Sequence, residues 1–214
     1  MKPEIHIEIV SDVVCPWCYI GKRRLERAID LVKDKIDVHV SYSPFELNPD
    51  IPASGIPQRE YLISKFGGEE RYQQITKQVT TTAAGEGLHF DFEHQLVSPN
   101  TRQAHRVLWL AAQTGHQAQL KEAYLKAYFE EGQDLSKTDN LTKIATNVGM
   151  DASRVTQLLN SDEGLAEVIA LEQRNQQRGI RGVPFYVVNN QYGISGAQPT
   201  QYFVEALTSI SAKA

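Results

Sequence analysis

The 214-residue sequence predicts an α/β fold in which one sheet is interrupted by a large, inserted all-helical domain. Three observations predict it. Residues 1–43 alternate between strand-like and helix-like patterns, residues 44–160 carry apolar side chains three or four positions apart, and residues 161–214 return to a mixed pattern. We therefore expect residues 1–43 and 161–214 to form one discontinuous domain, with residues 44–160 inserted into it.

The opening of the chain has a β-α-β pattern. Residues 5–10 and 36–42 alternate polar and apolar side chains, which is typical of strands. Residues 19–33 lie between them and carry an apolar face at helical spacing, so we expect a helix there. These elements form the first half of the predicted sheet domain.

The rest of the chain is predicted from the same periodicities and from turn residues. Helix-start signals such as Asn100-Thr101 and Asp151 support several of the helices. The predicted helices span residues 59–66, 70–84, 101–113, 117–130, 140–148, 152–159, 164–177 and 200–210, and residues 185–188 and 191–194 form a hairpin around Asn189-Asn190. A β-α-β start and a β-β-α finish, separated by helices, is the layout of a thioredoxin-like fold.

Composition excludes several functional classes. The 22 Lys and Arg residues against 26 Asp and Glu give a formal charge of -4, and both signs are interspersed, so we expect no nucleic-acid partner. No stretch approaches the roughly 18 apolar residues that a membrane span needs. The N-terminal residues look like a strand and not like a signal peptide, which predicts a cytoplasmic protein.

The two cysteines of the chain lie in Cys15-Pro16-Trp17-Cys18, directly after the first predicted strand. A Cys-x-x-Cys motif near a βαβ pattern indicates thiol–disulfide chemistry. A helix start would stabilise the thiolate of Cys15, and Pro16 suits a first helical turn because its missing N–H costs nothing there. We predict that Cys15 is the nucleophile and that Cys18 resolves the mixed disulfide.

A metal site at the cysteines is disfavoured. The histidines at 89, 94, 105 and 116 form no close pair of zinc-ligand spacing, so we expect neither a metal nor another bound cofactor beyond the redox-active disulfide. Trp17 is expected to be exposed at the helix start. Lys22-Arg23-Arg24 is expected to be the solvated face of the first helix.

Five motifs, in order along nearly the whole chain, resemble those of the DsbA family of thiol oxidoreductases, in its FrnE-like branch. The resemblance implies a thioredoxin-like fold with an inserted helical domain, and a cis Val183-Pro184 peptide that faces the active site. Pro184 would then belong to the catalytic site, and the Val183 backbone would pair with a substrate chain. The motifs are Ser11–Gly21, Phe45–Pro49, Asn100–Arg106, Gly182–Phe185 and Ser195–Pro199.

The resemblance implies protein substrates with disulfides or thiols, and glutathione is a candidate co-substrate. Pro16, Trp17 and Val183 are candidates for substrate binding. Asn100 and His105 are further candidates, although a helix cap and ordinary packing explain them more readily.

Two other functions stay open at this point. Relatives in the wider family include 2-hydroxychromene-2-carboxylate isomerases and kappa-class glutathione transferases, which generally have a serine where this chain has its cysteine pair. A binding or chaperone-like module is the weaker alternative. The Pro-Trp spacer lacks the histidine of the strongly oxidising members, so a cytosolic reductase or isomerase is favoured over a strong oxidant.

Overall fold

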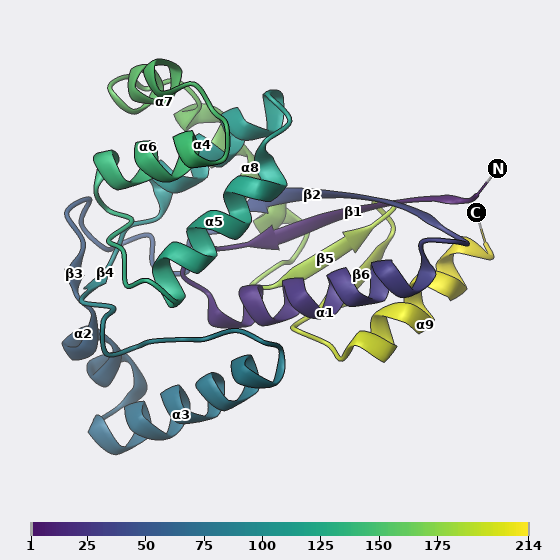
Figure 1. Cartoon of the computed structure of the whole chain (residues 1–214), viewed down its shortest axis with the longest axis horizontal. Helices are drawn as coiled ribbons and strands as arrows, with labels where there is room; N and C mark the ends of the chain where they lie inside the picture. Colours follow the sequence, from purple (N-terminus) through teal and green to yellow (C-terminus); the bar gives the residue numbers. More distant parts are fainter. Residues whose placement is uncertain (1, 214) are drawn as a thin grey trace.

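The sheet brings the two ends of the chain together. The structure, a computed structural model, describes residues 2–213. Its main sheet has the strand order β2-β1-β5-β6 (Figure 1). β1 (Glu4–Ser11) is parallel to β2 (Asp37–Pro44) and antiparallel to β5 (Phe185–Val188), which pairs antiparallel with β6 (Tyr192–Ser195). The predicted α/β, thioredoxin-like fold is confirmed.

The hairpin between β5 and β6 turns at the predicted dipeptide. Asn189 and Asn190 have φ values of 50° and 55°, in the left-handed region that Asn tolerates in tight turns, and Gln191 completes the loop because Val188 pairs with Tyr192. The backbone N–H of His6 donates a 2.8 Å hydrogen bond to Oδ1 of Asn189, which ties this turn to β1.

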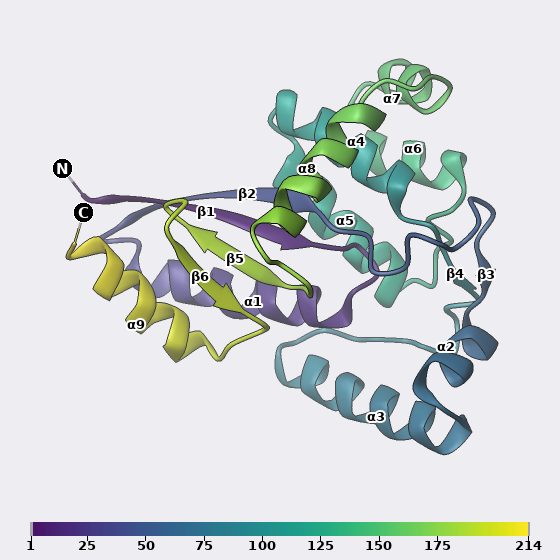
Figure 2. The same ribbon diagram turned by 180° about the vertical axis from the view of Figure 1, so that it is seen from behind.

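One face of the sheet is covered by α1 (Pro16–Val32) and α9 (Thr200–Ser211), which pack against each other (Figure 1). Their buried side chains form one core with alternate residues of the strands, because successive strand residues point to opposite faces. α8 (Leu165–Gln177) lies beside the sheet when the molecule is seen from behind (Figure 2) and contacts both β2 and α4 (Arg102–Gln113). The core between α1, α9 and the sheet includes Ile5, Ile7, Leu25, Ala28, Tyr186, Phe203 and Leu207.

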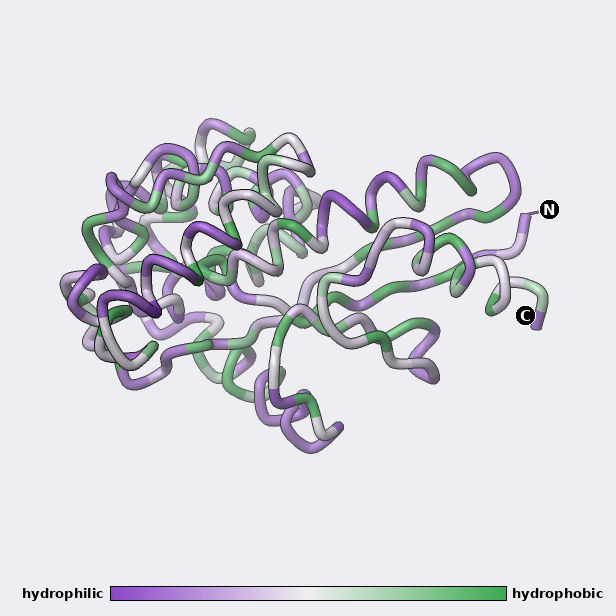
Figure 3. The backbone as a smooth tube through the Cα atoms, turned by 90° about the horizontal axis from the view of Figure 1, so that it is seen from below, coloured by the Kyte–Doolittle hydropathy of each residue, from purple (hydrophilic) through white to green (hydrophobic). Residues whose placement is uncertain are grey.

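The segment between β2 and α8 is helical, as predicted. It also contains a two-stranded ribbon, β3 (Ile56–Pro57) with β4 (Val97–Ser98), which is too short to produce a pattern in the sequence. Along these helices polar and apolar residues alternate, as expected where one face is buried (Figure 3). The helices are α2 (Gln58–Phe66), α3 (Glu69–Gly85), α4 (Arg102–Gln113), α5 (Gln117–Phe129), α6 (Thr138–Asn147) and α7 (Ala152–Leu159).

The boundaries of the two proposed domains stay predictions, because the helical part and the sheet share contacts. Tyr19 and Ile20 of α1 belong to the core of the helical segment, whereas Leu25 of the same helix belongs to the core of the sheet. No helix within residues 2–213 is long and apolar enough to cross a membrane.

Helix α1 begins three residues earlier than its apolar periodicity predicts. Pro16 occupies its first position, and the helix therefore includes Trp17 and Cys18. The start of α1 points toward the helical part of the molecule (Figure 1). This direction places the cysteine motif at the junction of the two parts.

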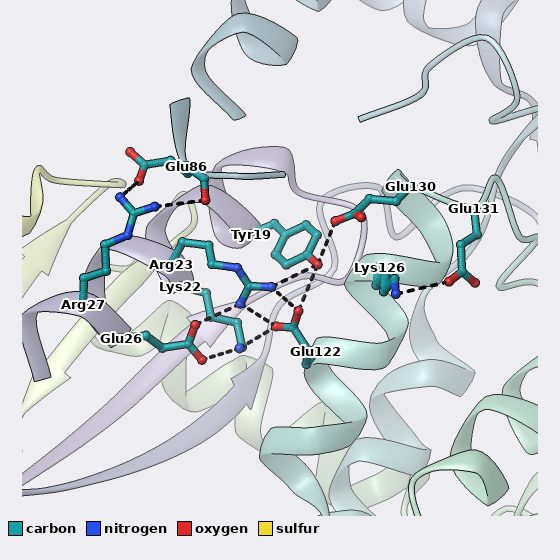
Figure 4. Close-up of polar contacts among 10 residues, drawn as sticks. All are labelled: Tyr19, Lys22, Arg23, Glu26, Arg27, Glu86, Glu122, Lys126, Glu130 and Glu131. Atoms are coloured by element: carbon teal, nitrogen blue, oxygen red, sulfur yellow. Dashed lines mark hydrogen bonds and ion pairs between the residues drawn. The ribbon is translucent and has the colours of Figure 1, made fainter. Parts of the chain in front are cut away.

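The prediction that Lys22-Arg23-Arg24 is a solvated face is wrong. Lys22 is buried, and its Nζ lies 2.5 Å from carboxylate oxygens of both Glu26 and Glu122 (Figure 4). Arg23 also binds Glu122, and Arg24 binds Glu86 through a 2.6 Å contact. Glu26 lies on α1 itself, whereas Glu122 comes from α5 and Glu86 from the turn after α3, so the basic side chains of α1 link it to the helical segment.

Replacing Glu122 by glutamine is expected to destabilise the fold. Burial alone would raise the pKa of Glu122, but the hydrogen bonds and charges of Arg23 and Lys22 lower it to about 2. The ion pairs therefore stabilise the folded state fully above about pH 4.5, and this stabilisation is lost as the pH falls toward 2. Because the substitution leaves the buried Lys22 without this partner, we expect Glu122→Gln to lower the free energy of unfolding by about 2 kcal/mol at pH 7.

Urea denaturation at pH 7 measures this effect, and Glu131→Gln is the matched control. Glu131 is exposed, its ionic contact is with Lys126 at 3.9 Å (Figure 4), and it also accepts a 2.7 Å hydrogen bond from Nε2 of Gln133. Its substitution should change the free energy of unfolding by less than about 0.5 kcal/mol. Equal effects of the two substitutions would show that the links between α1 and α5 contribute nothing particular to stability.

Candidate active site

The cysteine motif lies where β1 ends and α1 begins. Cys15 is the residue before the first helical position and has an extended backbone, with φ -94° and ψ 113°. Its carbonyl oxygen accepts a 3.0 Å hydrogen bond from the N–H of Cys18, which closes the first turn. Both cysteines are free thiols and lie 3.3 Å apart. Cys15 therefore stands at the positive end of the helix dipole, with Cys18 in direct contact.

The proline loop from the far end of the sequence completes this site. The Val183-Pro184 peptide bond is cis, as the family resemblance implies. The thiol of Cys15 donates to the carbonyl oxygen of Val183, with Sγ and O 3.6 Å apart. Residues separated by 168 positions in the sequence thus meet at one end of the sheet.

Electrostatics distinguish the two thiols. Burial raises the pKa of Cys18 well above its ordinary value, and the hydrogen bond and charge of Cys15 raise it further. The positive charge of Lys121 acts in the opposite direction. Cys18 therefore keeps its proton at neutral pH.

Lys121 is a functional candidate that the sequence analysis missed. It lies on α5, is 1% exposed, and has its Nζ 5.8 Å from the ring centroid of Tyr42. Burial lowers the pKa of Lys121, opposed by its interaction with Cys18 and then by those with Asp12 and Cys15. Lys121 shares the buried face of α5 with Leu120 and other apolar residues. A lysine within this apolar stripe was the signal that could have identified it.

A second buried pair supports the loop that precedes Cys15. Burial opposes ionisation of Asp12, but a hydrogen bond to His105, the charge of His105 and the N–H of Leu47 together hold its pKa below the ordinary value. Nε2 of His105 lies 3.2 Å from Oδ1 of Asp12, and the N–H groups of Val13 and Leu47 donate to the same carboxylate at 2.7 and 2.8 Å. Asp12 thus connects the active-site loop to α4 and to the segment after β2.

Cys15 faces a cavity of about 290 Å³ between the α1 start and helices α2 and α3. Of the predicted substrate-binding residues, Pro16, Trp17 and Val183 line this cavity together with Cys15. His105 instead lines a smaller cavity of about 160 Å³, together with Lys121. The two cavities have no lining residue in common.

Trp17 is less exposed than the sequence predicts, and Asn100 does not line the cavity beside Cys15. The expectation that Trp17 is exposed is wrong, because its side chain packs half-buried against the core of the helical segment. Asn100 lies outside the cavity. Its Oδ1 accepts from the N–H of Arg102 at 3.0 Å and its Nδ2 donates to the carbonyl of Ile51 at 2.8 Å, so it holds the start of α4. Its role in substrate contact stays a prediction.

The side chains near the cysteines do not form a metal-binding cluster of the usual kind. Among residues 2–213, no three His, Cys, Asp or Glu side chains are grouped so that they could share a metal ion. Lys121 is the positively charged side chain that lowers the pKa of Cys18. The arrangement is suited to proton transfer between a thiol and an amine.

Comparison with known families agrees with this geometry. Residues 6–208 match the DSBA-like thioredoxin domain. The chain belongs to this family. The DSBA-like domain described here shares 32% sequence identity and a TM-score of 0.90 with the crystal structure of a probable DsbA oxidoreductase from Streptomyces coelicolor, over 98% of this chain and 91% of the other. An oxidoreductase-type enzyme with a thioredoxin-like fold is therefore supported.

Two other relatives of this DSBA-like domain cover almost its whole length. YwbO of Bacillus subtilis (strain 168) is 28% identical over 217 residues, which are 95% of this chain and 96% of that protein. The cytosolic disulfide reductase DsbM from Pseudomonas aeruginosa, crystallised with GSH, is 14% identical with a TM-score of 0.63, over 96% of this chain and 98% of the other. At 14% identity, this similarity shows that the two proteins share a fold.

Proposed function

We propose that the protein is a thiol–disulfide oxidoreductase that acts through Cys15 as nucleophile and Cys18 as resolving thiol. The observation that carries the proposal is the pair itself: two free thiols lie 3.3 Å apart at the start of a helix, and one of them faces a cavity. The other is buried, and the positive charge of the buried Lys121 acts on it. Such a pair can attack a disulfide and then release the product by forming its own disulfide.

The reaction begins with the thiolate of Cys15. It attacks one sulfur of the substrate disulfide, the substrate S–S bond breaks, and the leaving thiolate takes a proton from water. Cys18 then transfers its proton to the neutral amine of Lys121 and attacks Sγ of Cys15. The Cys15–substrate bond breaks, the second substrate thiolate takes up the proton, and the enzyme holds a Cys15–Cys18 disulfide. Two electrons have passed from the enzyme to the substrate.

Net reduction or isomerisation of substrates is favoured over net oxidation. The Pro16-Trp17 spacer supports this direction, because it lacks the histidine of the strongly oxidising family members. Glutathione is the proposed reductant: two molecules would reopen the Cys15–Cys18 disulfide and leave as glutathione disulfide. This role places the protein in the reducing cytoplasm, the compartment named for the structurally similar DsbM.

The Val183 backbone and Pro184 are proposed to orient the substrate. The carbonyl of Val183 accepts the thiol hydrogen of Cys15 in the reduced protein. When Cys15 loses that hydrogen, the carbonyl becomes able to accept an N–H from an extended substrate chain. Edge-to-edge pairing of this kind would align the substrate sulfur with Cys15.

Insulin reduction coupled to glutathione, glutathione reductase and NADPH tests the proposal. We expect NADPH consumption that requires insulin and rises in proportion to the protein added, together with reactivation of scrambled ribonuclease. The same preparation is assayed for glutathione conjugation to an electrophile such as chlorodinitrobenzene. Conjugation without any protein-dependent disulfide reduction would instead assign the protein to the glutathione-transferase or isomerase class.

A further inference from the structure

The cavity beside Cys15 has a predominantly apolar wall. It is enclosed by side chains of α1, α2, α3 and α5 and of the segments that follow β2 and α3, so it lies between the sheet part and the helical part of the chain. Its volume of about 290 Å³ is close to the lower limit of ordinary small-molecule sites. The apolar wall includes Trp17, Leu62, Phe66, Val79, Phe92 and Phe129.

Gln58, a polar residue that lines this cavity, has one buried side-chain atom without a hydrogen-bond partner among the described residues. Gln58 is 1% exposed, and its Nε2 donates a 2.6 Å hydrogen bond to Oε1 of Gln95. Gln95 in turn donates to the carbonyl of Phe129 at 3.4 Å, which fixes the orientation of both amides. Oε1 of Gln58 has no hydrogen-bond partner among residues 2–213. A buried acceptor without a partner is costly, and a ligand that carries an O–H or N–H would satisfy it.

Access to Cys15 also favours a ligand that enters this cavity. Cys15 is only 3% exposed, and it is one of the residues that line this cavity. A sulfur whose substituent fills the cavity would be brought to Sγ of Cys15 by the burial of that substituent.

We infer that this site selects small disulfides in which one sulfur carries an aromatic group, and that the aromatic half bears a hydrogen-bond donor at its far end. The inference rests on the proposed function and defines its substrate class. Cys15 attacks the sulfur that bears the aromatic group, the S–S bond to the other half breaks, and that half leaves as a thiolate which takes a proton from water. Cys18 then displaces the aromatic thiol from Cys15, and the two electrons come from the enzyme thiols.

Three mixed disulfides of glutathione test the inference. Their second halves are 2-hydroxyethanethiol, 2-phenylethanethiol and 2-(4-hydroxyphenyl)ethanethiol, which are alkyl thiols of similar basicity. Each reacts with the reduced Cys18→Ser protein, and the rate of adduct formation is divided by the rate for free dithiothreitol with the same disulfide. Intact mass identifies which half stays on Cys15.

We expect the phenylethyl compound to react at least about tenfold faster than the hydroxyethyl compound, because the cavity removes its ring from water. The hydroxyphenyl compound should react faster still, and both should leave the aromatic half on Cys15. Equal normalised rates for the phenylethyl and hydroxyethyl compounds, or retention of the glutathione half, would overturn the inference. A hydroxyphenyl compound no faster than the phenylethyl compound would overturn the assignment of the donor to Gln58.

Two substitutions on the same helix locate the effect. Thr76 and Thr80 are one turn apart on α3. Both line a groove between α3 and the segment that follows it, but only Thr76 also lines the cavity beside Cys15. Thr76→Trp should remove most of the preference for the aromatic compounds, and Thr80→Trp should retain it. If all three disulfides fail to react with the reduced Cys18→Ser protein, the proposed function itself fails. If all react without preference, only the substrate class is wrong.

Discussion

Replacing Cys15 by serine is expected to lower the rate of disulfide reduction by about 10³-fold or more, because a hydroxyl at this position cannot form the attacking thiolate. Cys15 is the thiol that faces the cavity, and it stands at the start of α1. Cys18 cannot substitute for it, since burial holds its pKa well above the ordinary value and keeps it protonated at neutral pH. The coupled insulin assay measures the loss directly.

The Cys18→Ser protein is the matched variant and should behave differently. Its Cys15 can still attack, so the first step should proceed at a rate within about threefold of the wild-type rate. Without the resolving thiol, the mixed disulfide should persist and be visible by intact mass. Equal residual turnover in both single variants would contradict the separate roles of the two cysteines.

Replacing Lys121 by methionine is expected to slow the second step by about 10²-fold while leaving the first step unchanged. Lys121 is the buried amine whose largest favourable interaction is with Cys18, and burial lowers its pKa so that the neutral, proton-accepting form is more accessible. Without this amine, Cys18 has to lose its proton to water. A single-turnover experiment resolves the two steps: adduct formation should match wild type, and release of the second substrate thiol should be slow.

The pH dependence separates a proton acceptor from a structural residue. In the wild-type protein, release should accelerate as pH rises and Lys121 loses its proton. In Lys121→Met the acceleration should move to higher pH, where it follows the raised pKa of Cys18. Methionine fills a similar volume without a buried charge, so the free energy of unfolding should stay the same or increase.

Lys126→Met is the matched control. It removes an exposed lysine of the same helix and should change neither step. An unchanged release rate and pH profile in Lys121→Met would remove the lysine from the mechanism.

Local sequence patterns were sufficient to predict the main helices and strands and the pair of cysteines. The alternation in β1, the apolar face of α1 and the Asn189-Asn190 turn each depend on neighbouring residues, and each appears where it was expected. The motif spacing placed Cys15 and Cys18 at a helix start, and the family resemblance supplied the cis bond at Pro184. These features follow from short stretches of chain or from a pattern carried by a whole family.

Features that depend on contacts between distant segments were missed. Lys22 and Arg23 look like an exposed basic run until Glu122, about 100 positions away, is placed beside them. Its place at a helix start predicts that Trp17 is exposed, but the side chain packs against the core of the helical segment. Lys121 is an ordinary helical lysine until its helix packs against the cysteine motif. Periodicity specifies which face of a helix is buried, but not which charged groups meet across the interface.

The most direct test of the division of roles between the cysteines uses the unmodified protein. Reduced wild-type protein is treated at pH 7 with one equivalent of iodoacetamide, and tandem mass spectrometry of the peptide that contains the motif counts the label on each sulfur. We predict that the label lies almost entirely on Cys15, because that thiol faces the cavity while Cys18 keeps its proton in the interior. Label shared equally between the two cysteines, or concentrated on Cys18, would contradict the account.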